Sequence, residues 1–178
     1  MPDVRRFIES FRMNVITVGT WAMVAAYAVA HDQIIVRIAA EHFTVYHPNV
    51  LGAGSAAAQA ACCAFVASIG PGLAFGLYLA VAASVGNLPK LRISEALAGV
   101  AAVIAVTEVL SEAAGLMSFL LGRPLYPVAW YPGDKTVPLL VTQSIQITCY
   151  GSATVLSGLL LVFAVYRRVR LKKASFRV

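Results

Sequence analysis

The amino-acid sequence indicates an all-α integral membrane protein, built as a four-transmembrane-helix bundle. Apolar residues make up 60% of the chain and charged residues only 12%, and the mean hydropathy is +0.78. A soluble domain typically has about 45–50% apolar and about 25% charged residues. Four long apolar stretches are also nearly free of charged residues. These stretches do not alternate apolar and polar residues as the strands of a membrane barrel do, so helices are favoured.

The four expected spans cover residues 13–30, 54–86, 93–121 and 137–166. A hydrocarbon core of about 30 Å requires about 20 helical residues. The first stretch is near this limit, and the other three are long enough to tilt. Residues 28–30 also fit a signal-peptide cleavage site, but Asp3 and Glu9 are unusual in front of one. We therefore expect a single membrane domain over residues 1–178, with a basic tail at 167–178.

The Lys and Arg residues predict the orientation of the bundle. Most of them lie on one side of the expected membrane, at Arg5, Arg6, Arg12, Lys90, Arg92 and along the tail. The other side has Arg37, Arg123 and Lys135. By the positive-inside rule, both termini are cytoplasmic and the connections 31–53 and 122–136 face outward. We expect a bacterial-type inner (plasma) membrane, whose anionic lipids attract the tail. The net charge of +6 therefore does not call for a nucleic acid partner.

Each outward connection has its own pattern. In residues 31–53, a polar face with Arg37 and Glu41 opposes an apolar one formed by Ile34, Ile35, Ile38 and Val45. This pattern predicts a short amphipathic outer helix after the first span. The connection 122–136 contains Tyr126, Trp130 and Tyr131, which fit either an interfacial anchor or a lid over the bundle.

The most informative residues are Glu108 and Glu112 in the third span, because ionisable groups inside a bilayer are costly and usually functional. Their i,i+4 spacing puts them on one helix face. Two carboxylates this close cannot both stay ionised in a dry site. Either one holds a proton or a cation neutralises them.

Further polar residues lie at a similar depth in the neighbouring spans. Gln143, Gln146 and Tyr150 follow i, i+3, i+7 spacing, and Gln59 lies in the second span. With the two glutamates they predict an outward-facing acidic and polar pocket for a cation or small polar ligand, closed on the inner side by apolar residues. The alternative is that the amides only connect helices. Gly70-Pro71-Gly72 predicts a kink in the second span, either for packing or facing a ligand.

A divalent or transition metal ion is a possible cofactor. His31, Glu41, His42 and His47 lie in or beside the first outward connection, and imidazole and carboxylate groups are metal ligands. His42 and His47 would sit at the mouth of the pocket. The i,i+5 spacing of these two histidines is not by itself a metal motif. The cysteines at 62, 63 and 149 form no CxxC pair, which argues against thiol redox chemistry.

We expect a role in transport or as a subunit of a membrane complex. One alternative is a membrane-embedded enzyme, metal-dependent or quinone-linked, that uses the same carboxylates. Another is a structural partner of a second membrane protein. Small residues such as those of GAGSAAAQAA allow close helix contact, and therefore also a homo-oligomer.

Overall fold

The computed structural model describes residues 2–131, 133 and 135–175, without the side chains of residues 2, 3, 5 and 6. The predicted topology residues Arg5, Arg6 and Arg177 therefore have side chains outside the described residues. The elements are α1 (Pro2–Ile38), α2 (Glu41–Thr44), η1 (Val50–Gly52), α3 (Ala56–Ser84), α4 (Ile93–Leu121), η2 (Val128–Trp130) and α5 (Val137–Ser175). Within this part of the chain, four helices (α1, α3, α4 and α5) are long and apolar enough to cross a membrane. The prediction of an all-helical chain with four such helices is confirmed.

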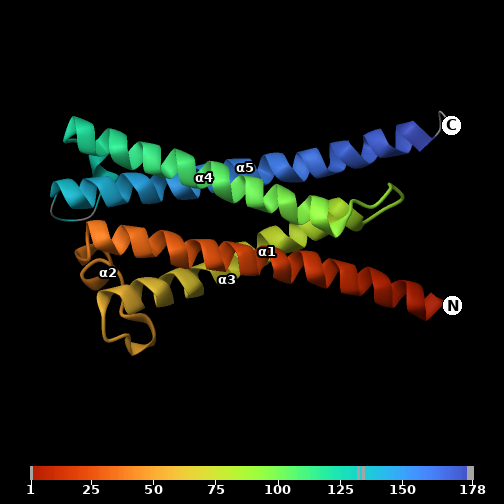
Figure 1. Ribbon diagram of the computed structural model, residues 1–178, viewed down its shortest axis with the longest axis horizontal. Coiled ribbons are helices and arrows are strands. Elements are labelled where there is room, and N and C mark those ends of the chain that lie inside the picture. The colour runs from red at the N-terminus through yellow and green to blue at the C-terminus, as the bar shows by residue number, and fades with distance from the viewer. Residues whose placement is uncertain (1, 132, 134, 176–178) are drawn as a thin grey trace.

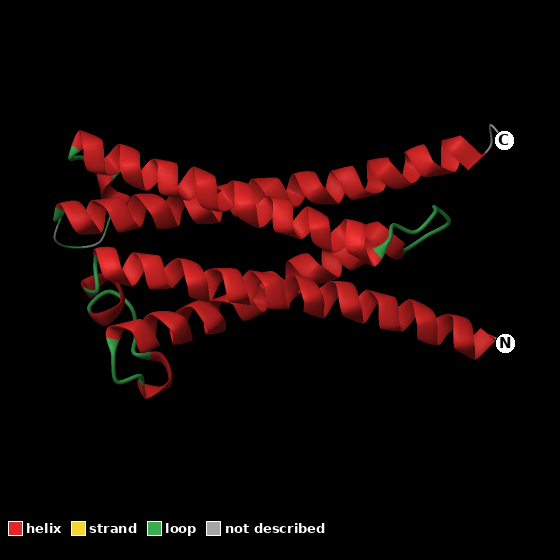
Figure 2. Ribbon diagram, in the orientation of Figure 1, coloured by secondary structure: helices red, strands yellow, loops and turns green. Residues whose placement is uncertain are grey.

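The four long helices form two antiparallel pairs (Figure 1). Helix α1 packs along α3 and helix α4 packs along α5, while contacts between the two pairs are sparser. Both termini and the connection 85–92 lie at one end of the bundle, which we name the termini end. The two longer connections, with α2, η1 and η2, lie at the other end, which we name the loop end (Figure 2).

Local signals explain where α3 and α4 begin and end. The hydroxyl of Ser55 accepts a hydrogen bond from the backbone N–H of Ala58 at 3.2 Å, which caps the start of α3. At the start of α4, the carboxylate of Glu95 accepts from the backbone N–H of Arg92 at 3.0 Å. Helix α4 ends at Gly122, whose φ of 60° belongs to the left-handed region that glycine adopts without strain. The bounds of α4 coincide with the predicted span.

Helix α1 extends further than the sequence patterns predict. It continues to Ile38, so Ile34, Ile35 and Ile38 belong to the first long helix and not to a separate amphipathic helix. Ile35 is fully buried in an apolar cluster with neighbours from other elements, which favours continuing the helix past the charged Asp32. The expected outer helix is reduced to the four residues of α2. Helix α5 likewise runs on to Ser175, so the described part of the basic tail is helical.

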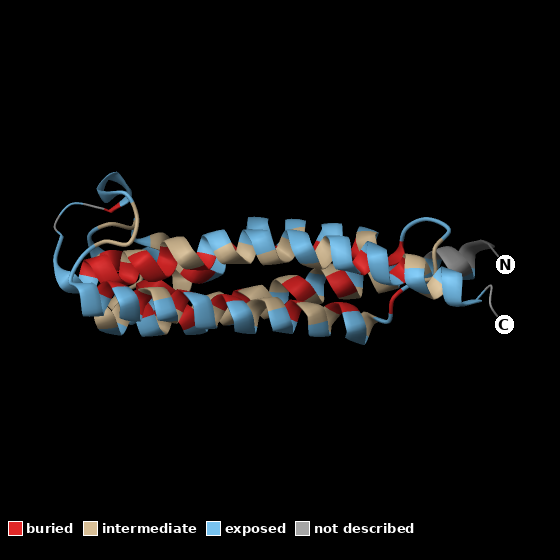
Figure 3. Ribbon diagram, turned by 90° about the horizontal axis from the view of Figure 1, so that it is seen from above, coloured by how far each residue is buried: buried red, intermediate tan, exposed pale blue. Residues whose placement is uncertain are grey.

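Two apolar clusters occupy the two ends of the bundle. The cluster at the termini end includes Ile16, Leu79 and Val100. The cluster at the loop end includes Ile35, Phe43 and Ile145. Figure 3 shows buried residues gathered toward both ends, with the strongest concentration at the loop end. Between these clusters lie the polar side chains that form the candidate site.

The backbones of α1 and α3 touch at Gly76. A Cβ atom at Gly76 would lie 2.5 Å from the carbonyl oxygen of Thr17.

We predict that Gly76→Ala destabilises the protein by about 1–3 kcal/mol, because one of the two backbones must move. The matched control is Gly70→Ala on the same helix, where the new Cβ would meet no described atom within 4 Å. Thermal unfolding in one detergent measures both, and equal Tm values for the two variants would contradict the close approach.

Arg168 connects α5 to the connection 85–92. It is only 2% exposed and donates hydrogen bonds at 2.7–3.1 Å to the carbonyl oxygens of Ala82, Val85, Leu88 and Pro89. A residue expected only to set membrane topology is therefore also a structural cap for the carboxyl end of α3.

We predict that Arg168→Gln lowers the free energy of unfolding by more than about 2 kcal/mol, because several charge-assisted hydrogen bonds are lost together. Arg170→Gln is the control, since Arg170 is exposed and changes at such sites cost about 0.5 kcal/mol. Chemical unfolding curves compare the two. A loss no larger than that of the control would show that the cap contributes little.

Candidate cation site

His31, Glu108 and Glu112 converge between α1 and α4, and we name these three residues the cation cluster. Each offers one ligand atom, and these atoms all lie within 4.8 Å of one another. No other group of three His, Cys, Asp or Glu side chains comes as close within the described residues. The two predicted glutamates are thus brought together with one of the four predicted metal ligands.

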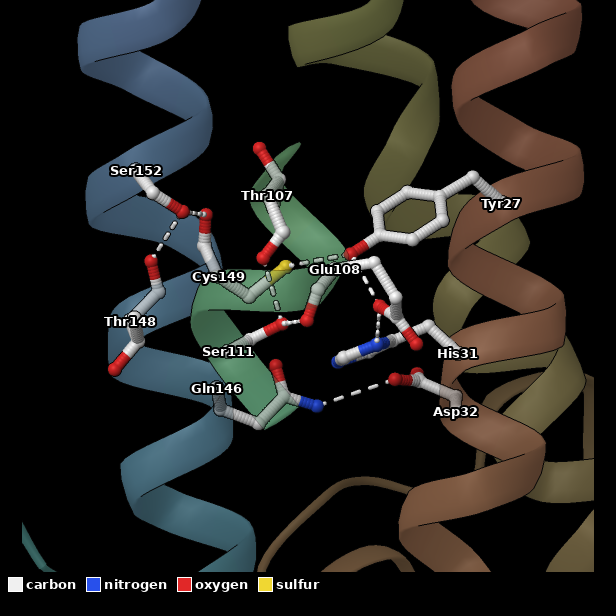
Figure 4. A network of polar contacts seen from close by, with 10 residues as sticks. All are labelled: Tyr27, His31, Asp32, Thr107, Glu108, Ser111, Gln146, Thr148, Cys149 and Ser152. Carbon is white, nitrogen blue, oxygen red and sulfur yellow. Dashed lines mark hydrogen bonds and ion pairs between the residues drawn. The ribbon is translucent and has the colours of Figure 1, made fainter. Parts of the chain in front are cut away.

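Glu108 is the best-connected member of the cation cluster. Its Oε2 atom lies 2.8 Å from Nδ1 of His31 and accepts a hydrogen bond from the hydroxyl of Tyr27 at 2.8 Å (Figure 4). Tyr27 and His31 are four residues apart on α1, so they present their polar atoms on one face. The Tyr27 hydroxyl also lies 3.4 Å from the sulfur of Cys149 on α5. The Tyr27 hydroxyl therefore connects the Glu108 carboxylate on α4 to Cys149 on α5.

Two buried atoms of the cation cluster are unsatisfied. His31 is 4% exposed, and its Nε2 atom has no hydrogen-bond partner among the described residues. The Oε1 atom of Glu112 is also buried and has no hydrogen-bond partner among the described residues. Buried polar atoms in proteins almost always have partners. These atoms are therefore available to a bound ion or ligand.

Asp32 and Gln146 form a second buried polar contact beside the cluster. Nε2 of Gln146 donates to Oδ1 of Asp32 at 3.1 Å, and the two residues are 8% and 6% exposed (Figure 4). Gln146 is a predicted site residue. Asp32 was not predicted because the first span was expected to end before it. Tyr27 lies within the expected span, and the signal that could have identified it is its i,i+4 spacing from His31.

The other predicted wall residues have different surroundings. Nε2 of Gln59 donates to the carbonyl oxygens of Phe43 at 2.5 Å and His47 at 3.4 Å, so it holds the first connection against α3. Nε2 of Gln143 donates to the carbonyl oxygen of Trp130 at 2.9 Å, which fastens the second connection. Neither residue belongs to the cation cluster. Their amides connect the two long helices to the outward connections, a role that neither interpretation of the sequence included.

A cavity of 400 Å³ lies at the loop end of the bundle. Its lining includes His42, His47, Gln143, Gln146 and Tyr150, together with Trp130. Tyr150 on α5 borders this cavity, and its side chain is 64% exposed. The predicted glutamine and tyrosine stripe therefore faces two of the predicted histidines.

His42 and His47 pack against each other and not against the cation cluster. Their ring centroids are 4.7 Å apart, and Nδ1 of His47 donates to the backbone carbonyl of His42 at 2.7 Å. Glu41 is half-buried in α2. The predicted metal set is thus divided. His31 joins the two glutamates, while Glu41, His42 and His47 remain in the connection.

The cation cluster has the composition of a site for a divalent or transition metal ion. An imidazole nitrogen with carboxylate oxygens is a common ligand set for such ions. Without an ion, the two carboxylates would have to share a proton or rely on His31 for charge balance. Both states keep the cluster neutral enough for an apolar bundle.

The environment of His42 makes stability depend on pH. Burial, with a smaller contribution from His47, lowers the pKa of His42 to about 4, against an ordinary value of about 6.5. A histidine that is neutral in the fold contributes stability above its unfolded pKa, and this contribution is lost as the pH falls toward 4.

We predict that the Tm of the wild type falls more between pH 7 and pH 4.5 than the Tm of His42→Gln. Parallel pH curves for the two proteins would contradict this.

No protein-family model, curated protein or solved structure matches this chain. The function is therefore inferred from the cation cluster and the cavities beside it.

Proposed function

We propose that this chain is an integral membrane protein that binds a divalent cation at the cation cluster, and that it acts in transport or as a subunit of a membrane complex. The observation that carries the proposal is the convergence of His31, Glu108 and Glu112 within 4.8 Å on helices long enough to cross a membrane. The unsatisfied Nε2 of His31 and Oε1 of Glu112 supply free ligand capacity.

The chemistry of the ligands favours a first-row transition metal ion over Na⁺, Mg²⁺ or Ca²⁺. Imidazole suits zinc, copper, iron and nickel, whereas the harder ions prefer sites made of oxygen atoms alone. A divalent ion also balances two ionised carboxylates. This balance removes the main cost of placing Glu108 and Glu112 in an apolar bundle.

The cavities offer an approach to the site from the loop end. The 400 Å³ cavity shares His47, Gln146 and Tyr150 with a second cavity of 340 Å³ that extends to His31 and Asp32. Toward the termini end, the apolar cluster around Leu79 and Val100 lies below the site. This asymmetry supports a site that is reached from one side only.

The distribution of basic residues supports the orientation within this proposal. Lys90, Arg92, Arg168 and the described basic residues after it lie at the termini end of the bundle. By the positive-inside rule, the termini end is cytoplasmic and the loop end faces outward, in a bacterial-type inner membrane.

Direct binding tests the cation cluster. We predict that the purified protein in nanodiscs binds Zn²⁺ with one ion per chain. Glu112→Gln and His31→Gln should each weaken binding by at least about tenfold, because each removes a ligand. Glu95→Gln is the matched control, since Glu95 lies on the same helix in its first turn and outside the cluster. Isothermal titration calorimetry measures all four proteins.

Equal Zn²⁺ affinity in the wild type and in Glu112→Gln would contradict the proposal, as would the absence of stoichiometric binding. Zn²⁺ uptake into proteoliposomes then separates the two roles. Uptake that is lost in Glu112→Gln supports transport, and binding without uptake supports a subunit role.

A further inference from the structure

A second candidate site lies between α3 and α5. Two cavities of 340 Å³ and 380 Å³ share the lining residues Val24, Tyr27 and Ala153, and we name them together the α3–α5 cavity. Its walls come from α3 and α5, and its floor comes from α1 and α4. Each of the two volumes falls within the range of about 300–1,000 Å³ that is usual for small-molecule sites.

The α3–α5 cavity is polar at one end and apolar at the other. Its polar end is lined by Tyr27, His31, Asp32 and Gln146. Figure 4 shows the three α1 side chains facing Gln146 and Cys149 on α5. The other end is bounded mainly by apolar side chains, such as Phe75, Ile104 and Leu161. This gradient fits a ligand with a small polar head and a long apolar chain.

Polar atoms without partners line this cavity. His31 and Thr107 are 4% and 1% exposed, and their Nε2 and Oγ1 atoms find no hydrogen-bond partner within the described part of the chain. Buried polar atoms in proteins almost always have partners, so these two atoms are available to a ligand.

The charged residues around the cavity restrict which head group a bound ligand can have. None of the described lining residues is Lys or Arg, and Asp32 stands at the polar end. A phosphate head would therefore be buried without a positive partner, which is unfavourable. This lining excludes an anionic head group, and an uncharged head group that accepts hydrogen bonds fits it.

We propose that the α3–α5 cavity binds an isoprenoid quinone or quinol. The flat ring would lie at the polar end beside Tyr27. Its two oxygen atoms, on opposite edges, would meet the imidazole of His31 on one side and the hydroxyl of Thr107 on the other. The isoprenoid chain would extend toward Phe75 and Leu161. This site has a different ligand from the cation cluster, and the two ligands compete for the Nε2 atom of His31.

The glycines of α5 supply a matched pair of variants. Gly158 lines the apolar end, and a Cβ there would meet no described atom within 4 Å. Gly158→Leu therefore adds an apolar side chain to the cavity at a position where the new Cβ has room. Gly151 has equally open surroundings among the described atoms, but it does not line the cavity. Gly151→Leu is thus the control for adding the same side chain to the same helix.

The test uses the full chain in nanodiscs of quinone-free phospholipid, with ubiquinone-2 as the probe and Tm as the readout, because a ligand that binds the native state raises Tm in a saturable way. The wild type and Gly151→Leu should both show a saturable rise. Gly158→Leu should fold with an unchanged or higher Tm and need at least tenfold more ubiquinone-2 for the same rise.

Several outcomes would overturn the proposal. One is the absence of a saturable rise in the wild type, and another is an equal response in Gly158→Leu. A third is an equal response to monoolein, which would indicate a general lipid site. Zn²⁺ affinity is measured on the same variants. If the Zn²⁺ affinity is unchanged in Gly158→Leu, the experiment tests the quinone site independently of the cation cluster.

Discussion

The structure depends on satisfying acidic groups inside an apolar helical bundle. A carboxylate away from water is costly unless a hydrogen bond, a proton or a cation compensates it. Glu108 is compensated by Tyr27 and His31, and Asp32 by Gln146. Glu112 is not compensated by any described side chain at its Oε1 atom. This difference is why the cation cluster, and not the wider set of polar residues, is the centre of the proposed site.

The two helix pairs explain how one bundle holds two different kinds of cavity. Close contact between α1 and α3, as at Gly76, and between α4 and α5 leaves a less tightly packed seam between the pairs. The cation cluster occupies this seam on the side of α1 and α4. The α3–α5 cavity occupies it on the other side. His31 borders both regions, so a ligand in one can influence the other through a single imidazole ring.

The long helices could be predicted from the sequence because composition and length alone decide them. The bounds of α4 followed from a long apolar run with few charges, and the pairing of Glu108 with Glu112 followed from helical spacing. The end of α1 could not be found in this way, because Asp32 is stabilised by Gln146, a partner more than a hundred residues away. For the same reason the sequence grouped His31 with Glu41, His42 and His47 of the first connection, whereas it lies beside Glu108 and Glu112. The role of Gln59 depends on carbonyl groups of a loop, which no pattern reveals.

X-ray absorption spectroscopy of the Zn²⁺-loaded protein tests the central claim most directly, because it reports the atoms bound to the ion. We expect imidazole and carboxylate ligands at about 2.0–2.2 Å from the ion, with the imidazole contribution lost in His31→Gln. Sulfur ligands at about 2.3 Å, or a shell that His31→Gln leaves unchanged, would contradict it.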